Sequence, residues 1–590
     1  MKRTKQFIII ALSFMLTESI NAQFAFLYSS TGMEYGKANT VDTDNNYINA
    51  ALFQNTININ PTGSTPLTAP GQSTQIALTK YTKNGQLLWG KTMGGTATSE
   101  GPHGVACDAD KNIYMTGYFG STTLTGAQSA SFNPAGGGNI STQGNEDCFV
   151  AKYNQNGDYQ WAFGLGNAGA ETQERAWDIA VESNGDLYVG GGYHGTMNFN
   201  PFGTAVSKTL PTANVGLFLT KYNTSGACQW VISIAAECTD VFTEGYITFD
   251  SDNKGGLFVA GNFRGTNVDF NPNGITPTTL SSSGLTDIFI AKYNNSDGTL
   301  VWVKKIGGAA SEVVSPGALR CDKNGNPYFT GRISGTGSVD FDPTPNIVNV
   351  TNSALFLSSF DTNGNMRFAS GFASGAGDGG HRIGFDSNNN VYLAGWMNGT
   401  ATFGNGISVT AKSPTADAFL AKFSNSGTCQ WAFSFGGEGA TANNICAGLA
   451  VDQQNNIYLT GQLYGANADF DPSPSAELKL SCAGNNDCFV AKYTSDGQLW
   501  KATNTALDDN YKMNNTLQIY PTLVRCGENI HIKSENIDIK EIFIFNNQGQ
   551  LVYSSKNIVE FIVSSSLIQG NYYFKIVTNK SNIFSRILIY

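Results

Sequence analysis

Short apolar runs separated by polar turns follow one another along most of the chain, and they recur in a fixed order. The unit is found seven times between about residues 24 and 505, with a period of roughly 69 residues. Each unit has an apolar segment that ends in an acid, a short polar turn, an aromatic residue and, three positions later, a glycine. The acids are Asp42, Asp108, Glu182, Asp250, Asp322, Asp386 and Asp452. The aromatic residues are Tyr47, Tyr114, Tyr188, Phe258, Tyr328, Tyr392 and Tyr458. The glycines are Gly117, Gly191, Gly261, Gly331, Gly395 and Gly461, with Ala50 in the first unit.

A second landmark in each unit is an apolar strand of the type Phe-Val-Ala-Lys-Tyr, followed by a large aromatic residue. The strands end at Tyr81, Tyr153, Tyr222, Tyr293, Phe360, Phe423 and Tyr493. The aromatic residues that follow are Trp89, Trp161, Trp230, Trp302, Phe368, Trp431 and Trp500. The turn between the two is rich in Asn, Asp and Gly, which tolerate the positive φ of tight hairpins. Each unit is therefore predicted to form two hairpins, four strands in all.

Four antiparallel strands repeated seven times predict a β-propeller, because each small sheet can bury both of its faces only against the sheets beside it. The segment before each acid alternates bulky and small residues, as Val105 and Cys107 do with Ala106. Arg320 departs from this alternation, and the sequence offers no explanation for it. At the start, Phe24-Ala25-Phe26 resembles Trp161-Ala162-Phe163. We therefore expect the N-terminal segment to supply the outer strand of the last blade and so to close the ring.

The repeat stops after Trp500, and a polar linker covers residues 506–515. About 75 residues follow, in which strand-like runs such as Ile542-Phe543-Ile544-Phe545 alternate with short turns. These features predict an all-β chain. Residues 23–505 form a seven-bladed β-propeller of four-stranded antiparallel blades, and residues 516–590 form a small C-terminal β-sandwich.

Charge and the N-terminal segment bear on where the protein acts. The formal net charge is -10, and Lys and Arg are scattered singly, so a nucleic-acid partner is not expected. Residues 1–22 have the layout of a secretory signal peptide: basic Lys2, Arg3 and Lys5, an apolar run, and a small-residue cleavage site ending at Ala22. No later stretch approaches the roughly 20 apolar residues of a membrane helix. The sequence thus predicts export without a transmembrane segment.

The ten cysteines form no CxxC pair and no spacing suited to zinc. Several recur at matching places in the repeats, as Cys148 and Cys488 do, which is typical of small buried apolar residues. A disulfide is permitted outside the cell, and Cys482 with Cys488 is the best local candidate. The sequence does not decide whether these two cysteines form a disulfide.

Two resemblances to known families follow from these motifs. Leu449-Ala450-Val451-Asp452 and Asn456-Ile457-Tyr458-Leu459-Thr460-Gly461 resemble the bacterial β-propeller repeat family, and the likeness covers roughly four-fifths of the chain. It implies the fold and says almost nothing of activity, since propellers have unrelated functions.

The C-terminal part resembles the sorting domain of the type IX secretion system of Bacteroidota. The motifs that carry the likeness are Leu517-Gln518-Ile519-Tyr520-Pro521, Asn547-Gln548-Gly549-Gln550-Leu551-Val552 and Leu567-Ile568-Gln569-Gly570-Asn571-Tyr572-Tyr573. Thr522 and Tyr590 depart from the family pattern, which usually has Asn and Lys there. The resemblance implies secretion across the outer membrane by the type IX machinery, removal of this domain, and attachment to the cell surface or release. An ordinary adhesive β-sandwich is the alternative.

Strand order places all the long loops on one face of the propeller, where we expect binding. Residues that enter the innermost strands from that face should ring the mouth of the central channel. The candidate ligand-binding residues are Lys37, His103, Glu174, Trp177, Glu244 and His381. His103 and His381 occupy the same repeat position. They could hold a ligand across the channel, but chance or loop solvation explains the coincidence more simply.

A further recurring motif is Asn-Pro or Asp-Pro after an apolar residue, and in three copies Asp269, Asp340 or Asp469 stands just before it. Oxygen atoms two residues apart can bind calcium. Asx-Pro also initiates turns and ends strands, which favours an architectural role. Calcium is therefore the one cofactor that the sequence leaves open, and no resident metal site is predicted.

Signatures of hydrolases, zinc proteases, phosphate-binding loops and sialidase-type propellers are missing from the sequence, so no catalytic residue is predicted. The leading hypothesis is a secreted or cell-surface binding or adhesion module without enzymatic activity, with a polysaccharide or another protein as ligand. The alternatives are a glycan-active hydrolase or lyase, using carboxylates such as Glu174 and Glu244 at the channel mouth, and a structural component of the cell envelope.

Overall fold

A computed structural model describes residues 24–501 with short gaps, together with the strands between 517 and 589. The gaps are 70–72, 96–98, 122–126, 168–172, 212–213, 242–243, 336–337, 352–354, 373–378 and 440–442. Gln23–Trp500 forms one compact unit, and the C-terminal strands belong to another. The predicted signal peptide and linker lie outside the described residues. Within the described ranges no helix is long and apolar enough to cross a membrane.

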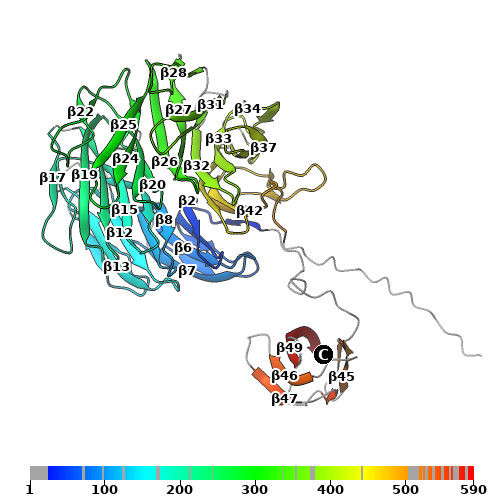
Figure 1. Cartoon of the computed structure of the whole chain (residues 1–590). Coiled ribbons are helices and arrows are strands. Elements are labelled where there is room, and N and C mark those ends of the chain that lie inside the picture. The colour runs from blue at the N-terminus through cyan, green and yellow to red at the C-terminus, as the bar shows by residue number, and fades with distance from the viewer. Residues whose placement is uncertain are drawn as a thin grey trace, which may run out of the picture. The chain divides into compact units, whose positions relative to one another are not determined.

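The large unit is a seven-bladed β-propeller, as predicted (Figure 1). The first four blades, each from innermost to outermost strand, are β2 (Tyr35–Val41), β3 (Tyr47–Phe53), β6 (Gln75–Tyr81) and β7 (Leu87–Met93); β8 (Ser99–Cys107), β9 (Ile113–Gly120), β12 (Glu146–Tyr153) and β13 (Tyr159–Leu165); β14 (Arg175–Val181), β15 (Leu187–Tyr193), β18 (Val215–Tyr222) and β19 (Cys228–Cys238); and β20 (Ile247–Ser251), β21 (Gly256–Phe263), β24 (Asp287–Asn294) and β25 (Leu300–Ile306). The other three are β26 (Ser311–Cys321), β27 (Pro327–Ser334), β30 (Leu355–Phe360) and β31 (Met366–Phe372); β32 (Gly379–Phe385), β33 (Val391–Met397), β36 (Asp417–Phe423) and β37 (Cys429–Phe435); and β38 (Ile445–Val451), β39 (Ile457–Leu463), β42 (Asp487–Tyr493) and β1 (Ala25–Tyr28).

The long connection between the second and third strands of every blade forms a small hairpin of its own. The seven hairpins are β4 (Thr56–Asn58) with β5 (Pro66–Thr68), β10 (Ser129–Ser131) with β11 (Asn139–Ser141), β16 (Thr196–Asn198) with β17 (Ser207–Thr209), β22 (Val268–Asp269) with β23 (Thr279–Leu280), β28 (Ser338–Asp340) with β29 (Asn349–Thr351), β34 (Thr400–Gly404) with β35 (Ile407–Thr410), and β40 (Ala468–Asp469) with β41 (Lys479–Leu480). The Asx-Pro motifs lie just after the first strand of such hairpins, where that strand ends.

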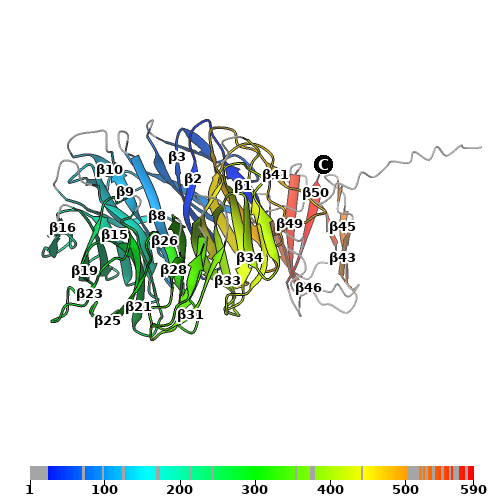
Figure 2. The same ribbon diagram turned by 90° about the horizontal axis from the view of Figure 1, so that it is seen from above.

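The N-terminal strand closes the ring, as the sequence predicts. β1 pairs antiparallel with β42 of the seventh blade, with Ala25 opposite Ala491 and Tyr28 opposite Cys488 (Figure 2). Phe24, just before β1, is buried, and its ring lies edge-on to Tyr458 at 5.6 Å between centroids. The last blade therefore takes its outermost strand from the other end of the chain, which removes the edge that β42 would otherwise expose.

The core lies between the blades and is divided into seven clusters, each shared by two neighbours. The cluster between the first and second blades, for example, joins Ile48 and Leu78 to Met115 and Phe149. Every sheet thus buries both faces against adjacent sheets, which is the reason a repeat of this kind needs a closed ring.

The repeated glycine is explained by the close approach of the innermost strand. A Cβ atom on Gly117 would lie 2.0 Å from the carbonyl oxygen of Gly101, and one on Gly191 would lie 1.9 Å from that of Arg175. Gly331, Gly395 and Gly461 face the same obstacle. A side chain at this position would push the first strand away from the second.

The acid assigned to the fourth unit, Asp250, is not the equivalent of the others. In most units the acid accepts hydrogen bonds from the backbone of the turn, as Asp452 does from Gln454 and Asn456. In the fourth blade Asp252 does this, through Lys254 and Gly256. Acids stand at both positions, so the sequence pattern alone selects the wrong one, and Asp250 lies two residues further into the innermost strand.

The C-terminal strands form two sheets. β43 (Leu517–Tyr520), β45 (Asn529–Ser534) and β48 (Glu560–Ile562) make a three-stranded sheet. β44 (Leu523–Val524), β50 (Asn582–Ile589), β49 (Gly570–Thr578), β46 (Ile539–Phe545) and β47 (Leu551–Lys556) make a five-stranded one. Ile542 and Ile544 of β46 are buried.

The candidate disulfide is not formed, and Cys482 and Cys488 are both free thiols. The Cys488 sulfur lies 3.8 Å from Nδ2 of Asn49, whereas the Cys482 thiol donates to the carbonyl oxygen of Leu463. The two sulfurs therefore have different surroundings.

Candidate functional site

A β-bulge in the innermost strand of six blades lies at the long-loop end of the channel. The register shifts fall between Gly36 and Ala38, Pro102 and Gly104, Ala176 and Asp178, Val314 and Leu319, Gly380 and Arg382, and Cys446 and Gly448. The register of β20 with β21 is continuous. Four of the predicted ligand-binding residues, Lys37, His103, Trp177 and His381, are the extra residues of these bulges. Because a bulge turns its extra residue away from the regular alternation, the bulges give these side chains equivalent positions around the channel.

His103 and Trp177 form a stacked pair between the second and third blades. Their rings lie 4.1 Å apart at 16°, and Nδ1 of His103 is 3.0 Å from the carbonyl oxygen of Ala176. Burial, together with the positive charge of Arg175, holds the pKa of His103 well below its usual range. His103 is therefore a neutral imidazole at physiological pH, and its ring is buried against Trp177 and Tyr118.

Lys37 and His381 complete the ring from the first and sixth blades. Nζ of Lys37 lies 3.7 Å from the centroid of the Tyr35 ring, and the His381 ring lies 5.5 Å from that of Trp396. Burial and the charges of Arg175 and Arg382 lower the pKa of Lys37 to about 7. Burial also holds the pKa of His381 well below its usual range. The ring contacts of the two histidines belong to different sectors of the channel. That His103 and His381 hold a ligand across it stays a hypothesis, and coincidence remains the simpler explanation.

Arg382 spans the channel, and sequence reasoning missed it. Its Nη2 lies 3.4 Å from the carbonyl oxygens of Lys37 and His103, and its Nη1 donates to the carbonyl oxygen of His381 at 3.2 Å. Gly317, with φ +66, makes room for it, since a Cβ there would lie 2.7 Å from Nη1. Burial lowers the pKa of Arg382 to about 10, so the guanidinium remains charged at neutral pH.

Arg175 adds a second guanidinium at the same end. Its Nη2 is 2.7 Å from Oε2 of Glu146, and the guanidinium lies 3.7 Å from the centroid of the Tyr118 ring. Trp177 meets Tyr246 edge-on at 4.8 Å. The long-loop end of the channel thus combines positive charges with aromatic faces. Lys37, His103, Trp177 and His381 were predicted, whereas Arg175, Arg382, Tyr118 and Tyr246 were not, because they come from positions that are not landmarks of the repeat.

The two predicted glutamates have different surroundings, and their pairing as acid and base stays a hypothesis. Glu174 is fully buried between the second and third blades, its carboxylate oxygens have no hydrogen-bond partner among the described residues, and burial raises its pKa. Nδ1 of His194 is 3.6 Å away. Glu244 accepts hydrogen bonds from Thr239 and Thr286. Burial raises the pKa of Glu244, but these bonds outweigh it and the pKa falls below its usual range.

Further along the channel, two charged residues stand at each of two successive levels. At the upper level Asp178 and Arg382 occupy the strand position that is filled by small residues on other blades, which are Ala38, Gly104, Thr248 and Gly448. At the lower level Asp250 and Arg320 face Thr40, Ala106, Ala180, Gly384 and Ala450. Nη1 of Arg320 lies 3.5 Å from Oδ2 of Asp178. Arg320, the exception to the bulky and small alternation, thus faces the channel with one edge of its guanidinium paired to Asp178.

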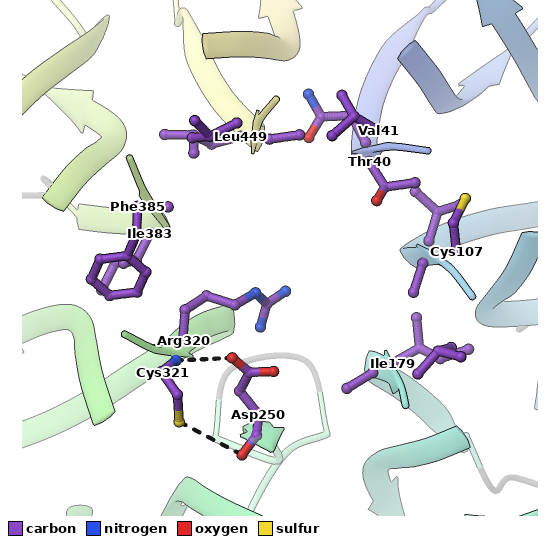
Figure 3. Close-up of a pocket in the computed structure, with 18 residues that line it drawn as sticks. Thr40, Val41, Cys107, Ile179, Asp250, Arg320, Cys321, Ile383, Phe385 and Leu449 are labelled. Carbon is purple, nitrogen blue, oxygen red and sulfur yellow. Dashed lines mark hydrogen bonds between the residues drawn. The ribbon is translucent and has the colours of Figure 1, made fainter. Parts of the chain in front are cut away.

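A cavity of about 360 Å³ occupies the channel at the lower level (Figure 3). It is lined by the last residues of the innermost strands and shares Val41, Cys107, Val181 and Val451 with a second cavity of about 290 Å³ among the turns that follow those strands. The cavity therefore continues toward the short-turn face, opposite the face where the sequence predicts binding. Sequence reasoning gave no sign of it, because five of its seven blades contribute only common uncharged residues.

The Asx-Pro motifs close the small hairpins. Oδ1 of Asp269 accepts hydrogen bonds from the backbone of Asn271 and Thr278, both at 2.9 Å. Asp340 and Asp469 make the same two bonds in their own hairpins. These bonds support the architectural role, and calcium binding stays a prediction. Across the part of the chain that the structure describes, no three His, Cys, Asp or Glu side chains converge as a metal site would require.

Comparisons with known proteins agree with the fold and leave the activity open. No family model matches the chain. A WD repeat-containing protein of Acanthamoeba polyphaga mimivirus, itself uncharacterised, is 23% identical over 611 residues that cover 89% of this chain and 43% of the viral protein. The chain therefore spans less than half the length of that relative.

Among solved structures, a protein of unknown function from Dyadobacter fermentans aligns with 80% of this chain and 97% of its own length, at 9% identity and a TM-score of 0.35. A polysaccharide lyase of the PL25 ulvan lyase family aligns with 82% of this chain and 98% of its own length, at 9% identity and a TM-score of 0.37. Likenesses at this level carry no argument about function. What the fold and the channel define is a seven-bladed β-propeller with a WD-repeat-like relative.

Proposed function

We propose that the protein is a secreted or cell-surface binding module without enzymatic activity, and that it binds an acidic polysaccharide at the long-loop end of its channel. The observation that carries this proposal is the ring of bulged residues, in which Lys37, His103, Trp177 and His381 occupy equivalent positions around one opening. Aromatic faces stack on sugar rings, and Arg175 and Arg382 supply charges that attract uronate or sulfate groups. Export by the type IX secretion machinery through the C-terminal domain belongs to the same proposal and rests on the motifs quoted above.

A glycan array probed with the purified protein tests this proposal, followed by calorimetry on each hit. We expect acidic glycans to bind, binding to weaken as salt rises, and Trp177→Ala to weaken it by about tenfold. Lys479→Gln is a matched control, because Lys479 pairs with Glu477 on the exposed surface of a small hairpin. Equal binding of neutral and acidic glycans, or no effect of Trp177→Ala in a folded variant, contradicts the proposal.

A glycan-active hydrolase or lyase is the second candidate. The observation that favours it is the raised pKa of the buried Glu174 carboxyl, a property of general acids. Incubation of each bound glycan with the protein and analysis of the products by mass spectrometry separates the two: cleavage supports the enzyme, and intact glycan supports the binding module. A structural role in the cell envelope is the outcome if no glycan binds and none is cleaved.

A further inference from the structure

Comparison of the seven blades shows which side chains the fold itself needs at the lower level of the channel. At this position five blades have Thr, Ala, Ala, Gly and Ala, while the adjacent fourth and fifth blades have Asp250 and Arg320. The five small residues show what the propeller requires there. Two opposite charges on neighbouring blades are not needed to build the ring, and placing them in a cavity costs solvation free energy. A bound molecule is the simplest use for them.

Arg320 is held so that it points into the cavity. Its Nη1 donates to the carbonyl oxygen of Leu319 at 2.6 Å and lies 3.5 Å from Asp178. About a third of the side chain, 32%, remains exposed, and Figure 3 shows the guanidinium in the middle of the cavity. Within the described residues the hydrogen bonds and the ion pair of Arg320 all use Nη1. The other edge, Nε and Nη2, therefore faces the cavity, and it has the fork geometry that matches a carboxylate.

Asp250 supplies the opposite charge from the neighbouring fourth blade. Its Oδ2 accepts a hydrogen bond from the backbone of Cys321 at 2.8 Å (Figure 3). Within the described residues the ion pair that Arg320 makes within 4.0 Å is with Asp178 and not with Asp250. Burial raises the pKa of Asp250 to about 6, even though Arg320 opposes the shift. A positively charged group in the cavity would keep this carboxylate ionised.

The rest of the wall combines small and polar groups with a few half-buried apolar side chains. Val41, Cys107 and Phe385 lie on the other blades around the charged pair (Figure 3), together with Val181 and Val451. A volume of about 360 Å³ lies at the lower end of the range for small-molecule pockets and accommodates a molecule the size of an amino acid. The wall therefore has one anion-binding group, one cation-binding group and an apolar surface.

We propose that this cavity binds a small zwitterion of the amino-acid class with an apolar side chain. The carboxylate of the ligand pairs with the free edge of Arg320, its ammonium group pairs with Asp250, and its side chain packs against Val181, Phe385 and Val451. The ligand enters from the short-turn face, where the second cavity continues the first. The site is separate from the long-loop mouth, since Arg382 lies across the channel between them, and it does not depend on polysaccharide binding.

Calorimetry and thermal-shift measurements on the full-length protein test this proposal with L-leucine and L-phenylalanine as probes. N-acetyl-L-leucine lacks the ammonium group and L-leucinamide lacks the carboxylate. We expect the two amino acids to bind and each decoy to bind about tenfold more weakly or less, because each loses one charge-assisted contact. Equal binding of amino acid and decoy, or no binding of either amino acid at millimolar concentration, overturns the proposal.

Variants that remove the charge of Arg320 or of Asp250 test the same contacts by changing the protein instead of the ligand. Arg320→Gln and Asp250→Asn should each weaken leucine binding by about tenfold while Lys479→Gln leaves it unchanged. Circular dichroism establishes that each variant is folded. If Arg320→Gln does not fold, the decoy series on the unaltered protein still decides the question. Polysaccharide binding should be unaffected by both variants, so a failure here is distinguishable from a failure of the proposed function.

Discussion

The side chains of Asn444 and Asp417 face each other across the junction between the sixth and seventh blades, where Nδ2 of Asn444 lies 3.4 Å from Oδ1 of Asp417. At the junction between the first and second blades, Gln75 donates to Glu100 in the same way at 3.1 Å. At three other junctions between blades, both of the positions equivalent to Asn444 and Asp417 hold a carboxyl group. The pairs are Glu34 with Asp487, Glu174 with Asp147, and Glu312 with Asp287. An amide donates to a carboxylate, whereas two carboxylates have no proton to donate to each other.

The acid pairs predict that the propeller loses stability as pH rises from about 4 to about 7. Burial raises the pKa values of Glu34, Asp147 and Glu312 to about 7 in each case, and the partner carboxylate adds to the shift. An unfolded chain titrates these groups near pH 4. Since the folded state holds the protons more tightly, their contribution is complete below pH 4 and is lost as pH passes 7. Denaturant unfolding at pH 5 and at pH 8 measures the difference, which we expect to be on the order of 2 kcal/mol per junction. Equal stability at the two values contradicts the prediction.

Converting an acid pair into a carboxylate and amide pair should remove the loss of stability at high pH from that junction, and the opposite conversion should create it. Glu174→Gln replaces an acid pair by the carboxylate and amide arrangement seen at Asn444, and we expect it to stabilise the protein at pH 8 with little effect at pH 5. Asn444→Asp makes the opposite change and should destabilise at pH 8 by on the order of 1 to 3 kcal/mol, since it leaves a buried carboxylate without its donor. Melting temperatures at both pH values provide the test. Shifts of the same sign in the two variants count against the argument.

Ring closure depends on Phe24 and β1. Phe24→Ala removes a buried ring that contacts Tyr47, Tyr458 and Trp500, and we expect a loss of about 3 to 5 kcal/mol. Deletion of residues 24–28 should cost more, because it also exposes the edge of β42 and promotes aggregation. Denaturant titration measures the first effect and light scattering the second. Leu88→Ala, at a half-exposed position, is the control and should be nearly neutral. Wild-type stability after the deletion would show that closure is not needed.

The repeated glycine gives a test of the contact between the first two strands of a blade. Gly117→Ala places a Cβ atom 2.0 Å from the carbonyl oxygen of Gly101, so β8 must move, at a cost of about 3 kcal/mol or more. Gly63→Ala is the matched control, because its nearest neighbour is the end of the Asn60 side chain at 3.2 Å in an exposed hairpin. The two variants are compared by thermal unfolding. Similar melting temperatures for both would mean that the strands separate at little cost.

The sequence predicts the fold well and the channel poorly, for one physical reason. Strand patterning and glycine spacing arise from contacts that every blade makes, so seven copies reinforce one another. The channel is built from differences between blades, such as Arg175, Asp178 and Arg382, which meet only when the ring closes. The bulges give Lys37, His103, Trp177 and His381 equivalent positions in their blades, but no sequence motif predicts a bulge. Asp250 was assigned to a turn because a second acid, Asp252, stands two residues away.

The pKa of Lys37 makes polysaccharide binding depend on pH. Burial beside Arg175 and Arg382 lowers that pKa to about 7, so the ammonium group loses its proton as pH rises through 7. The groups around it do not compensate, since burial holds the pKa of His103 well below its usual range and that of Tyr35 above its own. An acidic glycan should therefore bind about tenfold more tightly at pH 6 than at pH 8. Calorimetry at the two pH values measures this ratio, and Lys37→Gln should abolish most of it while leaving the folded state intact. A ratio that persists in Lys37→Gln would assign the titration to another group.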